Sequence, residues 1–210
     1  MLFRSGWGVR QDYAEAMRWY RQAADAGNSW GMYNIGGLYQ NGEGVPQNYA
    51  EAMRWFLKAA DAGHSWAMTI IGSLYHDGRR VPQDYGEAMR WYRKAADAGN
   101  STAMYFIGAL YRDGKGVKKD YAEAMKWFRQ AADAGDSDAM SNIGDMYYYG
   151  RGVQWNYAEA MKWYRKAADA GSGYGAYCVG YLYRHGEGVA RDTAEADRWY
   201  RKANELGYKC

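Results

Sequence analysis

Apolar and polar residues follow one another with the period of an α-helix, and they do so in two distinct segments. Between Tyr13 and Asp25, at about 100° per residue, small and apolar residues fall on one side of a helix and charged residues on the other. The apolar side consists of Tyr13, Ala16, Met17, Tyr20, Ala23 and Ala24. A second apolar segment runs from about Trp30 to Gln40. We predict a helix in each segment and name the second type helix A and the first type helix B.

Both segments recur at a fixed spacing of 36 residues, which is clearest at the tryptophans of helix B. These are Trp19, Trp55, Trp91, Trp127, Trp163 and Trp199. A gapless period of this size indicates an array in which each unit stacks only on its neighbours. We therefore predict one elongated domain over residues 1–210 without an internal linker. Its units are a partial repeat 1–27 and the repeats 28–63, 64–99, 100–135, 136–171 and 172–207.

The ends and the interior of these helices carry recognisable signals. An Asp or Asn lies three residues before a Glu at the start of every helix B, as Asp12 and Glu15 do. This spacing predicts a capping box, in which the Glu side chain reaches back to the N–H of the cap residue. Glycine recurs inside helix A, as at Gly72, and we expect it to allow close approach of helix B. The turn Gly42 to Val45 permits positive φ, but the third copy has Arg80 in place of its second glycine, which suggests that this glycine is dispensable.

Three motifs together resemble the Sel-one-like repeat family, a relative of the tetratricopeptide repeats. They are Ala-x-x-x-Ile-Gly-x-x-Tyr, seen in 67–75, Gly-x-Gly-Val, seen in 42–45, and Ala-x-x-Trp-x-x-x-Ala-Ala-x-x-Gly, seen in 88–99. The resemblance covers nearly the whole chain. It implies a tetratricopeptide-like, all-α superhelical solenoid of 36-residue antiparallel helix pairs, with right-handed superhelical winding. It also implies an adaptor in signalling or in bacterial host interaction. Some family members are secreted and carry a cysteine pair in every repeat, which this chain lacks.

Composition narrows the function further. A net charge of +3 is too small to indicate nucleic acid or an anionic membrane as partner. No apolar run reaches the roughly 18 residues of a membrane span, and no signal peptide is evident, so the compartment stays open. The two cysteines, Cys178 and Cys210, form no metal-binding spacing, and no catalytic constellation stands out. We expect neither enzyme activity nor a cofactor.

The copies differ from one another mainly on one face of helix A. Positions that vary share an arc of roughly 120°, and the nearly constant positions fill the opposite arc. In the related superhelices the A helices line the concave side, so the variable face is expected to form a groove. The candidate partner-binding residues are Trp30, Tyr33, Asn34, Trp66, Ile70, Tyr105, Phe106, Asp138, Asn142, Asp145, Tyr174, Tyr177 and Tyr181.

The aromatic content of this face favours a protein or peptide ligand over simple drift of a solvated surface, because exposed aromatic rings typically anchor interfaces. The amides of Asn34 and Asn142 are candidates for hydrogen bonds to an extended peptide. Some of the rings can instead pack between adjacent A helices, which needs no partner. Two further alternatives are a module that binds glycan or peptidoglycan fragments and a designed, consensus-like scaffold.

The two ends of the array also carry expectations. The last helix B has the polar residues Thr193, Asp197 and Asn204 where the fifth copy has Tyr157, Met161 and Ala168, which predicts a solvated terminal face. At the other end only Met1 to Ser5 correspond to a helix A. The first helix B then lacks its cover, which predicts self-association through this open end.

Overall fold

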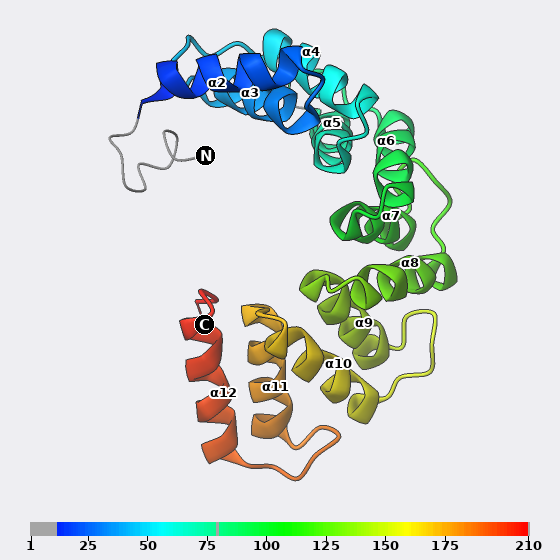
Figure 1. Ribbon diagram of the computed structural model, residues 1–210. Coiled ribbons are helices and arrows are strands. Elements are labelled where there is room, and N and C mark those ends of the chain that lie inside the picture. The colour runs from blue at the N-terminus through cyan, green and yellow to red at the C-terminus, as the bar shows by residue number, and fades with distance from the viewer. Residues whose placement is uncertain (1–11, 79, 210) are drawn as a thin grey trace. The chain divides into compact units, whose positions relative to one another are not determined.

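The computed structural model describes residues 12–78 and 80–209, and its secondary structure there is entirely α-helical (Figure 1). The helices are α2 (Tyr13–Asp25), α3 (Ser29–Asn41), α4 (Tyr49–Asp61), α5 (Ser65–Asp77), α6 (Tyr85–Asp97), α7 (Ser101–Asp113), α8 (Tyr121–Asp133), α9 (Ser137–Tyr149), α10 (Tyr157–Asp169), α11 (Gly173–His185) and α12 (Thr193–Glu205). The odd-numbered helices are the predicted A helices, and the even-numbered ones are the B helices.

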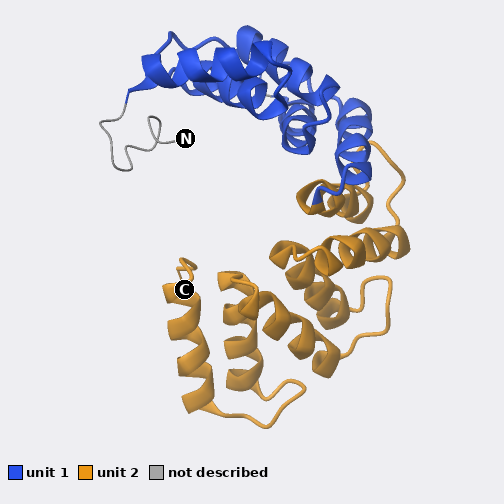
Figure 2. Cartoon of the chain, in the orientation of Figure 1, with its two compact units in different colours: residues 1–100 blue, residues 101–210 orange. Residues whose placement is uncertain are grey.

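Each A helix packs against the B helix that follows it, so the predicted all-α solenoid of antiparallel helix pairs is confirmed. The chain divides into two compact units, residues 1–100 and 101–210 (Figure 2). The first holds α2 to α6 and the second holds α7 to α12. The single domain expected over 1–210 stays a prediction.

The capping of helix B follows the sequence pattern only in part. The side chain of Asn48 accepts a hydrogen bond from the N–H of Glu51 at 3.1 Å, as the capping box requires. The N–H of Asn48, however, donates to the carbonyl oxygen of Tyr39 at 2.9 Å, so Glu51 does not reach back to it. Tyr39 lies in the last turn of α3, where carbonyl groups have no partner within the helix. Glu51 is therefore available to Arg54, and its carboxylate lies 2.9 Å from the guanidinium.

The recurring glycine of helix A is explained by the aromatic ring of the next helix B. A Cβ atom on Gly36 would lie 2.7 Å from ring carbons of Phe56, and one on Gly72 would lie 2.7 Å from those of Tyr92. Contacts this short do not occur between real atoms, so glycine is required for the two helices to approach. The expected close approach is confirmed, and the core ring is the Tyr or Phe that directly follows the tryptophan.

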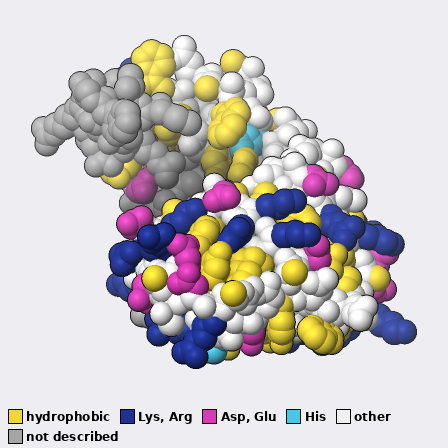
Figure 3. Space-filling view, turned by 90° about the horizontal axis from the view of Figure 1, so that it is seen from below, with side chains coloured by type: hydrophobic (Ala, Val, Ile, Leu, Met, Phe, Trp, Pro, Cys, Tyr) yellow, Lys and Arg dark blue, Asp and Glu magenta, His cyan; other side chains and the backbone are white. Residues whose placement is uncertain are grey.

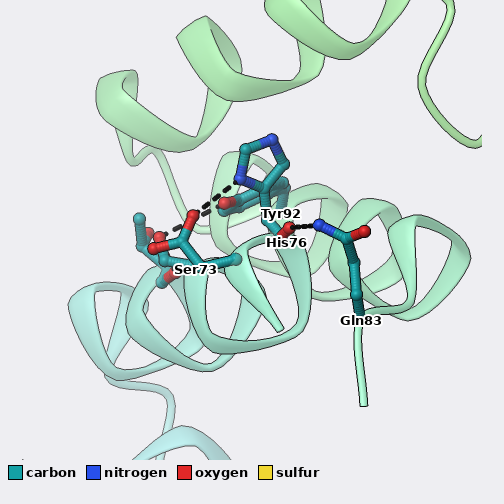
Figure 4. Close-up of polar contacts among 6 residues, drawn as sticks. Ser73, His76, Gln83 and Tyr92 are labelled. Atoms are coloured by element: carbon teal, nitrogen blue, oxygen red, sulfur yellow. Dashed lines mark hydrogen bonds and ion pairs between the residues drawn. The ribbon is translucent and has the colours of Figure 1, made fainter. Parts of the chain in front are cut away.

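The turn between helices A and B keeps its left-handed geometry even where glycine is missing. Arg80 has a φ of 71°, the same value as the equivalent Gly44. A side chain in this region costs about 1–2 kcal/mol, but the turn keeps its geometry with Arg80, so this glycine is dispensable for the turn, as predicted. The turn is stabilised by the side-chain amide of Gln83, which donates a hydrogen bond to the carbonyl oxygen of His76 at 2.8 Å (Figure 4).

The outer surface carries both signs of charge. On the face shown in Figure 3, Lys and Arg side chains are interspersed with Asp and Glu, and hydrophobic side chains lie between them. Along helix B, lysines extend over the tryptophan rings, as Lys58 does over Trp55 at 4.2 Å from the centroid. Basic side chains of helix B such as Arg54 and Lys58 thus already have acidic or aromatic neighbours within the chain.

The predictions for the two ends have different outcomes. The segment Met1 to Ser5, which the sequence pattern matches to part of a helix A, lies outside the described residues, and self-association through this end stays a prediction. Thr193, Asp197 and Asn204 are exposed on α12, and Asp197 accepts a hydrogen bond from Arg184 at 2.6 Å.

Candidate functional site

Two tryptophans of the first unit are the most exposed of the predicted groove residues there. Trp30 at the start of α3 is 52% exposed, and Trp66 at the equivalent position of α5 is 46% exposed. Trp30 lies edge-on to the imidazole of His64, with 4.4 Å between ring centroids, and Tyr33 stacks on the same imidazole at 4.5 Å. One side of Trp30 is therefore held by its neighbours, while half of its surface faces outward.

His64 itself performs a structural task in this cluster. Its Nδ1 atom accepts a hydrogen bond from the N–H of Ala67 at 3.2 Å and so caps the N-terminus of α5. The side chain is only 5% exposed, and burial lowers the pKa of the imidazole. A neutral ring is needed for the cap, because a protonated Nδ1 cannot accept a hydrogen bond.

Several predicted groove residues pack inward instead. Tyr33 and Tyr105 lie at 5.9 Å from the rings of Phe56 and Phe128, measured between centroids. Tyr177 lies at 5.5 Å from Tyr200 in the same way. Ile70 is half-buried against the core formed by α4 and α5. The tyrosines contribute to packing within their own repeats, Ile70 also packs against the preceding repeat, and only part of each side chain remains at the surface.

The two asparagines expected to bind a peptide backbone are engaged within their own helices. The amide of Asn34 donates to the carbonyl oxygen of Trp30 at 2.7 Å, and that of Asn142 donates to the carbonyl oxygen of Asp138 at 2.9 Å. The Asn142 carbonyl accepts a further hydrogen bond from Arg112. Hydrogen bonding to an incoming peptide would have to displace these contacts.

The second unit contains a cavity of 230 Å³ lined mainly by tyrosine. Its walls come from α9, α10 and α11, and they consist of Tyr148, Tyr149, Tyr164, Tyr174, Tyr177, Cys178, Tyr181 and Leu182. The structure thus brings together three of the predicted residues: Tyr174, Tyr177 and Tyr181. Phe106 is half-buried on α7, and Asp138 is exposed near the start of α9, and neither lines this cavity.

The predicted residue Asp145 anchors two of the rings that line the cavity. Its Oδ1 atom accepts hydrogen bonds from the hydroxyls of Tyr164 at 2.7 Å and Tyr174 at 3.0 Å. Burial raises the pKa of Asp145, while these two hydrogen bonds and the charges of Arg112 and Arg151 act in the opposite direction. The carboxylate therefore has a structural task in addition to any role in binding.

Cys178 is not a reactive thiol in this setting. The side chain is buried in the cavity wall, and burial raises the pKa of its thiol to about 12. The thiolate is the nucleophilic form of cysteine, and little of it exists near neutral pH at such a pKa.

Sequence comparison of the copies did not single out Tyr148, Tyr149, Tyr164 or Leu182. Tyr164 belongs to helix B, whose near-constancy indicated only packing. Tyr148 and Tyr149 occupy positions that vary between copies. The run Tyr147 to Tyr149 in the sequence is the signal that could have identified them.

The described part of the chain offers no feature that indicates a metal site or a membrane span. No group of three or more His, Cys, Asp or Glu side chains between residues 12 and 209 is arranged to hold a metal ion, leaving residue 79 aside. Among the helices of those same residues, none has the length and apolar character needed to cross a membrane.

The helix pairs and the variable face along the A helices define a tetratricopeptide-like α-solenoid. The chain belongs to the Sel1 repeat family. The sequence model of the Sel1 repeat matches residues 1–28, 31–64, 67–100, 101–136, 137–172 and 174–208. Sel1 repeat proteins generally act as non-catalytic scaffolds for protein interactions.

Solved structures agree with this membership. A Sel1 repeat protein from Oxalobacter formigenes is 38% identical over 97% of this chain and 84% of that one, with a TM-score of 0.91. The protein c5321, a protective antigen of uropathogenic Escherichia coli strains with an SLR fold, is 36% identical over 98% of this chain, with a TM-score of 0.86. This chain covers 44% of its length. The immunity protein Pa5087 from Pseudomonas aeruginosa, 20% identical over 92% of this chain and 74% of that one with a TM-score of 0.65, shares the fold. No curated protein matches the chain in a sequence search.

Proposed function

We propose that this chain is a non-catalytic scaffold that binds a protein or peptide on the variable face of its A helices. The observation that carries the proposal is the pair of exposed indoles at equivalent positions of neighbouring A helices, Trp30 and Trp66. Leaving so much aromatic surface in water is unfavourable, and such rings are enriched among the residues that dominate binding energy at protein interfaces. The small net charge of +3 indicates that apolar contact, and not net charge, provides most of the affinity.

The experiment compares two variants in capture of a partner by the full chain. The double substitution Trp30→Ala with Trp66→Ala should reduce the retained partner at least tenfold, because each anchor typically contributes about 2 kcal/mol or more. Trp155→Ala is the matched control, since Trp155 is 64% exposed but lies in the turn after α9 and not on an A helix.

Retention by Trp155→Ala and loss by the double variant would support the proposal. Equal retention by all three proteins would contradict it. Binding of peptidoglycan fragments in place of any protein would favour the glycan alternative.

A further inference from the structure

The tyrosine-lined cavity of the second unit has a feature that an ordinary packing defect lacks. Four of its rings, Tyr148, Tyr149, Tyr174 and Tyr181, come from the variable positions of α9 and α11, where other copies have different residues. Its volume of 230 Å³ is below the roughly 300–1,000 Å³ of pockets for drug-sized ligands. A cavity of this size suits the end of a single side chain.

The charges beside the cavity favour a cation. Asp145 holds two of the rings through its Oδ1 atom, and within the described residues its Oδ2 atom accepts no hydrogen bond. Next to Tyr148, the Oε2 atom of Glu187 is buried and accepts no hydrogen bond from the described residues. Burial, and after it a hydrogen bond with the Glu187 carboxylate, raises the pKa of the Tyr148 hydroxyl, which places this carboxylate next to the cavity wall.

The basic residues nearby do not cancel these two carboxylates. The guanidinium of Arg112 is paired with Asp113, with 2.7 Å between Nε and Oδ1. Arg151 lies over the ring of Tyr149, 4.8 Å from its centroid, and its charge acts on Asp145. The three carboxylates near the cavity thus outnumber the two guanidinium groups, so the potential there is negative.

Tyrosine rings in this chain already bind guanidinium groups. Among the described residues, arginine lies over tyrosine at several places, whereas lysine lies mostly over tryptophan, although Lys119 lies over Tyr121. The arginine pairs are Arg80 with Tyr49, Arg151 with Tyr149, Arg165 with Tyr183 and Arg184 with Tyr200. A planar guanidinium stacks on an aromatic ring and keeps its N–H groups free for oxygen acceptors in the ring plane. The cavity contains tyrosine and no tryptophan.

We propose that this cavity binds the guanidinium of an arginine side chain that a partner protein or peptide inserts between α9 and α11. The guanidinium stacks on the tyrosine rings and donates to Asp145 Oδ2. This assignment rests on the proposed function, because the arginine belongs to the ligand of the scaffold. It adds the chemical class of one anchor on that ligand.

The test titrates the full chain with N-acetyl-L-arginine amide and follows backbone amide resonances by NMR. Shifts should concentrate in α9 and α11. N-acetyl-L-citrulline amide, which has the same shape and no charge, should bind at least tenfold more weakly. N-acetyl-L-lysine amide, whose ammonium group is not planar, should also bind at least tenfold more weakly.

Two variants and one control separate binding from folding. Asp145→Asn keeps an oxygen that can accept from Tyr164 and Tyr174 but removes the charge, so it should weaken arginine binding at least tenfold with little change in Tm. Tyr181→Leu should weaken arginine binding by removing one ring. This variant provides the test if Asp145→Asn does not fold. Asp197→Asn removes the same charge from exposed α12 and should change nothing.

Citrulline or lysine binding as tightly as arginine, or unaltered binding in both variants, would overturn the inference. That outcome leaves the proposed function intact, because the function is tested at Trp30 and Trp66 in the other unit.

Discussion

At His64 a single side chain links capping, aromatic packing and acid sensitivity. The equivalent positions are Asn28, Asn100, Asp136 and Ser172, which are ordinary cap residues. The pKa of His64 is lowered by burial, so the unfolded chain takes up a proton at a higher pH than the folded chain does. The stabilisation by neutral His64 is complete above about pH 6.5 and is lost as the pH falls toward its folded pKa.

The substitution His64→Asn should therefore flatten the dependence of stability on pH. We expect urea denaturation of the wild type to show a free energy of unfolding that falls between pH 7.5 and pH 5. Each tenfold difference in proton affinity between the folded and the unfolded chain contributes up to about 1.4 kcal/mol to this loss. The variant keeps a cap but contains no titrating group there, so it should lose less over the same interval. Its stability at pH 7.5 sets the baseline, since the imidazole contacts with Trp30 and Tyr33 are also removed. Parallel curves for the two proteins would exclude this role for His64.

Single residues are also where sequence reasoning fell short. The glutamate of the capping box was assigned to the N–H of the cap residue, but a carbonyl from the preceding A helix already occupies that N–H. Asp145 was predicted from its variability, yet its hydrogen bonds to Tyr164 and Tyr174 could not be seen in one sequence. Such contacts depend on how two helices meet, and the local pattern records only the residues of one.

Whole elements were more predictable, because their signals are repeated in every copy. Helix positions, the glycine caps and the constant face of helix A all follow from periodicity and from the 36-residue spacing. The variable face was harder. Tyr33 lies in the variable arc, and whether such a ring packs on Phe56 or faces outward depends on the room left by the neighbouring helix.

Two adjacent glycines in α3 provide a direct test of how helices A and B fit together. Gly36→Ala should destabilise the chain by about 1–3 kcal/mol, because its Cβ would lie 2.7 Å from the Phe56 ring. Gly37→Ala should stabilise it by about 0.5–1 kcal/mol, since nothing lies within 4 Å and alanine is the better helix former. Both glycines have ordinary helical φ, so backbone geometry does not separate them. Chemical denaturation measures both, and destabilisation of similar size at the two positions would rule out the close-approach explanation.

At the scale of the whole molecule, the repeat pattern predicts one domain, whereas the structure contains two compact units. In a repeat array, stability is the sum of terms within repeats and between nearest neighbours, so damage in one repeat spreads mainly to the adjacent ones. Whether the chain unfolds as one cooperative body is thus a question of energy that the sequence pattern does not answer.

Substitutions at two equivalent core isoleucines test whether the chain unfolds as one cooperative domain. Ile71 in the first unit and Ile143 in the second are both fully buried, and replacing either by alanine should cost about 2–5 kcal/mol. In mild denaturant, Ile143→Ala should increase hydrogen exchange of amides in α8 to α10, while those in α2 to α4 stay protected. Ile71→Ala should reverse the pattern, exposing α4 to α6 and sparing α10 to α12. This follows because opening exposes only the repeats that have lost their packing, and distant repeats keep their own core and neighbours. If either substitution instead raised exchange equally in all helices, the chain would be one cooperative domain, as the sequence pattern predicts.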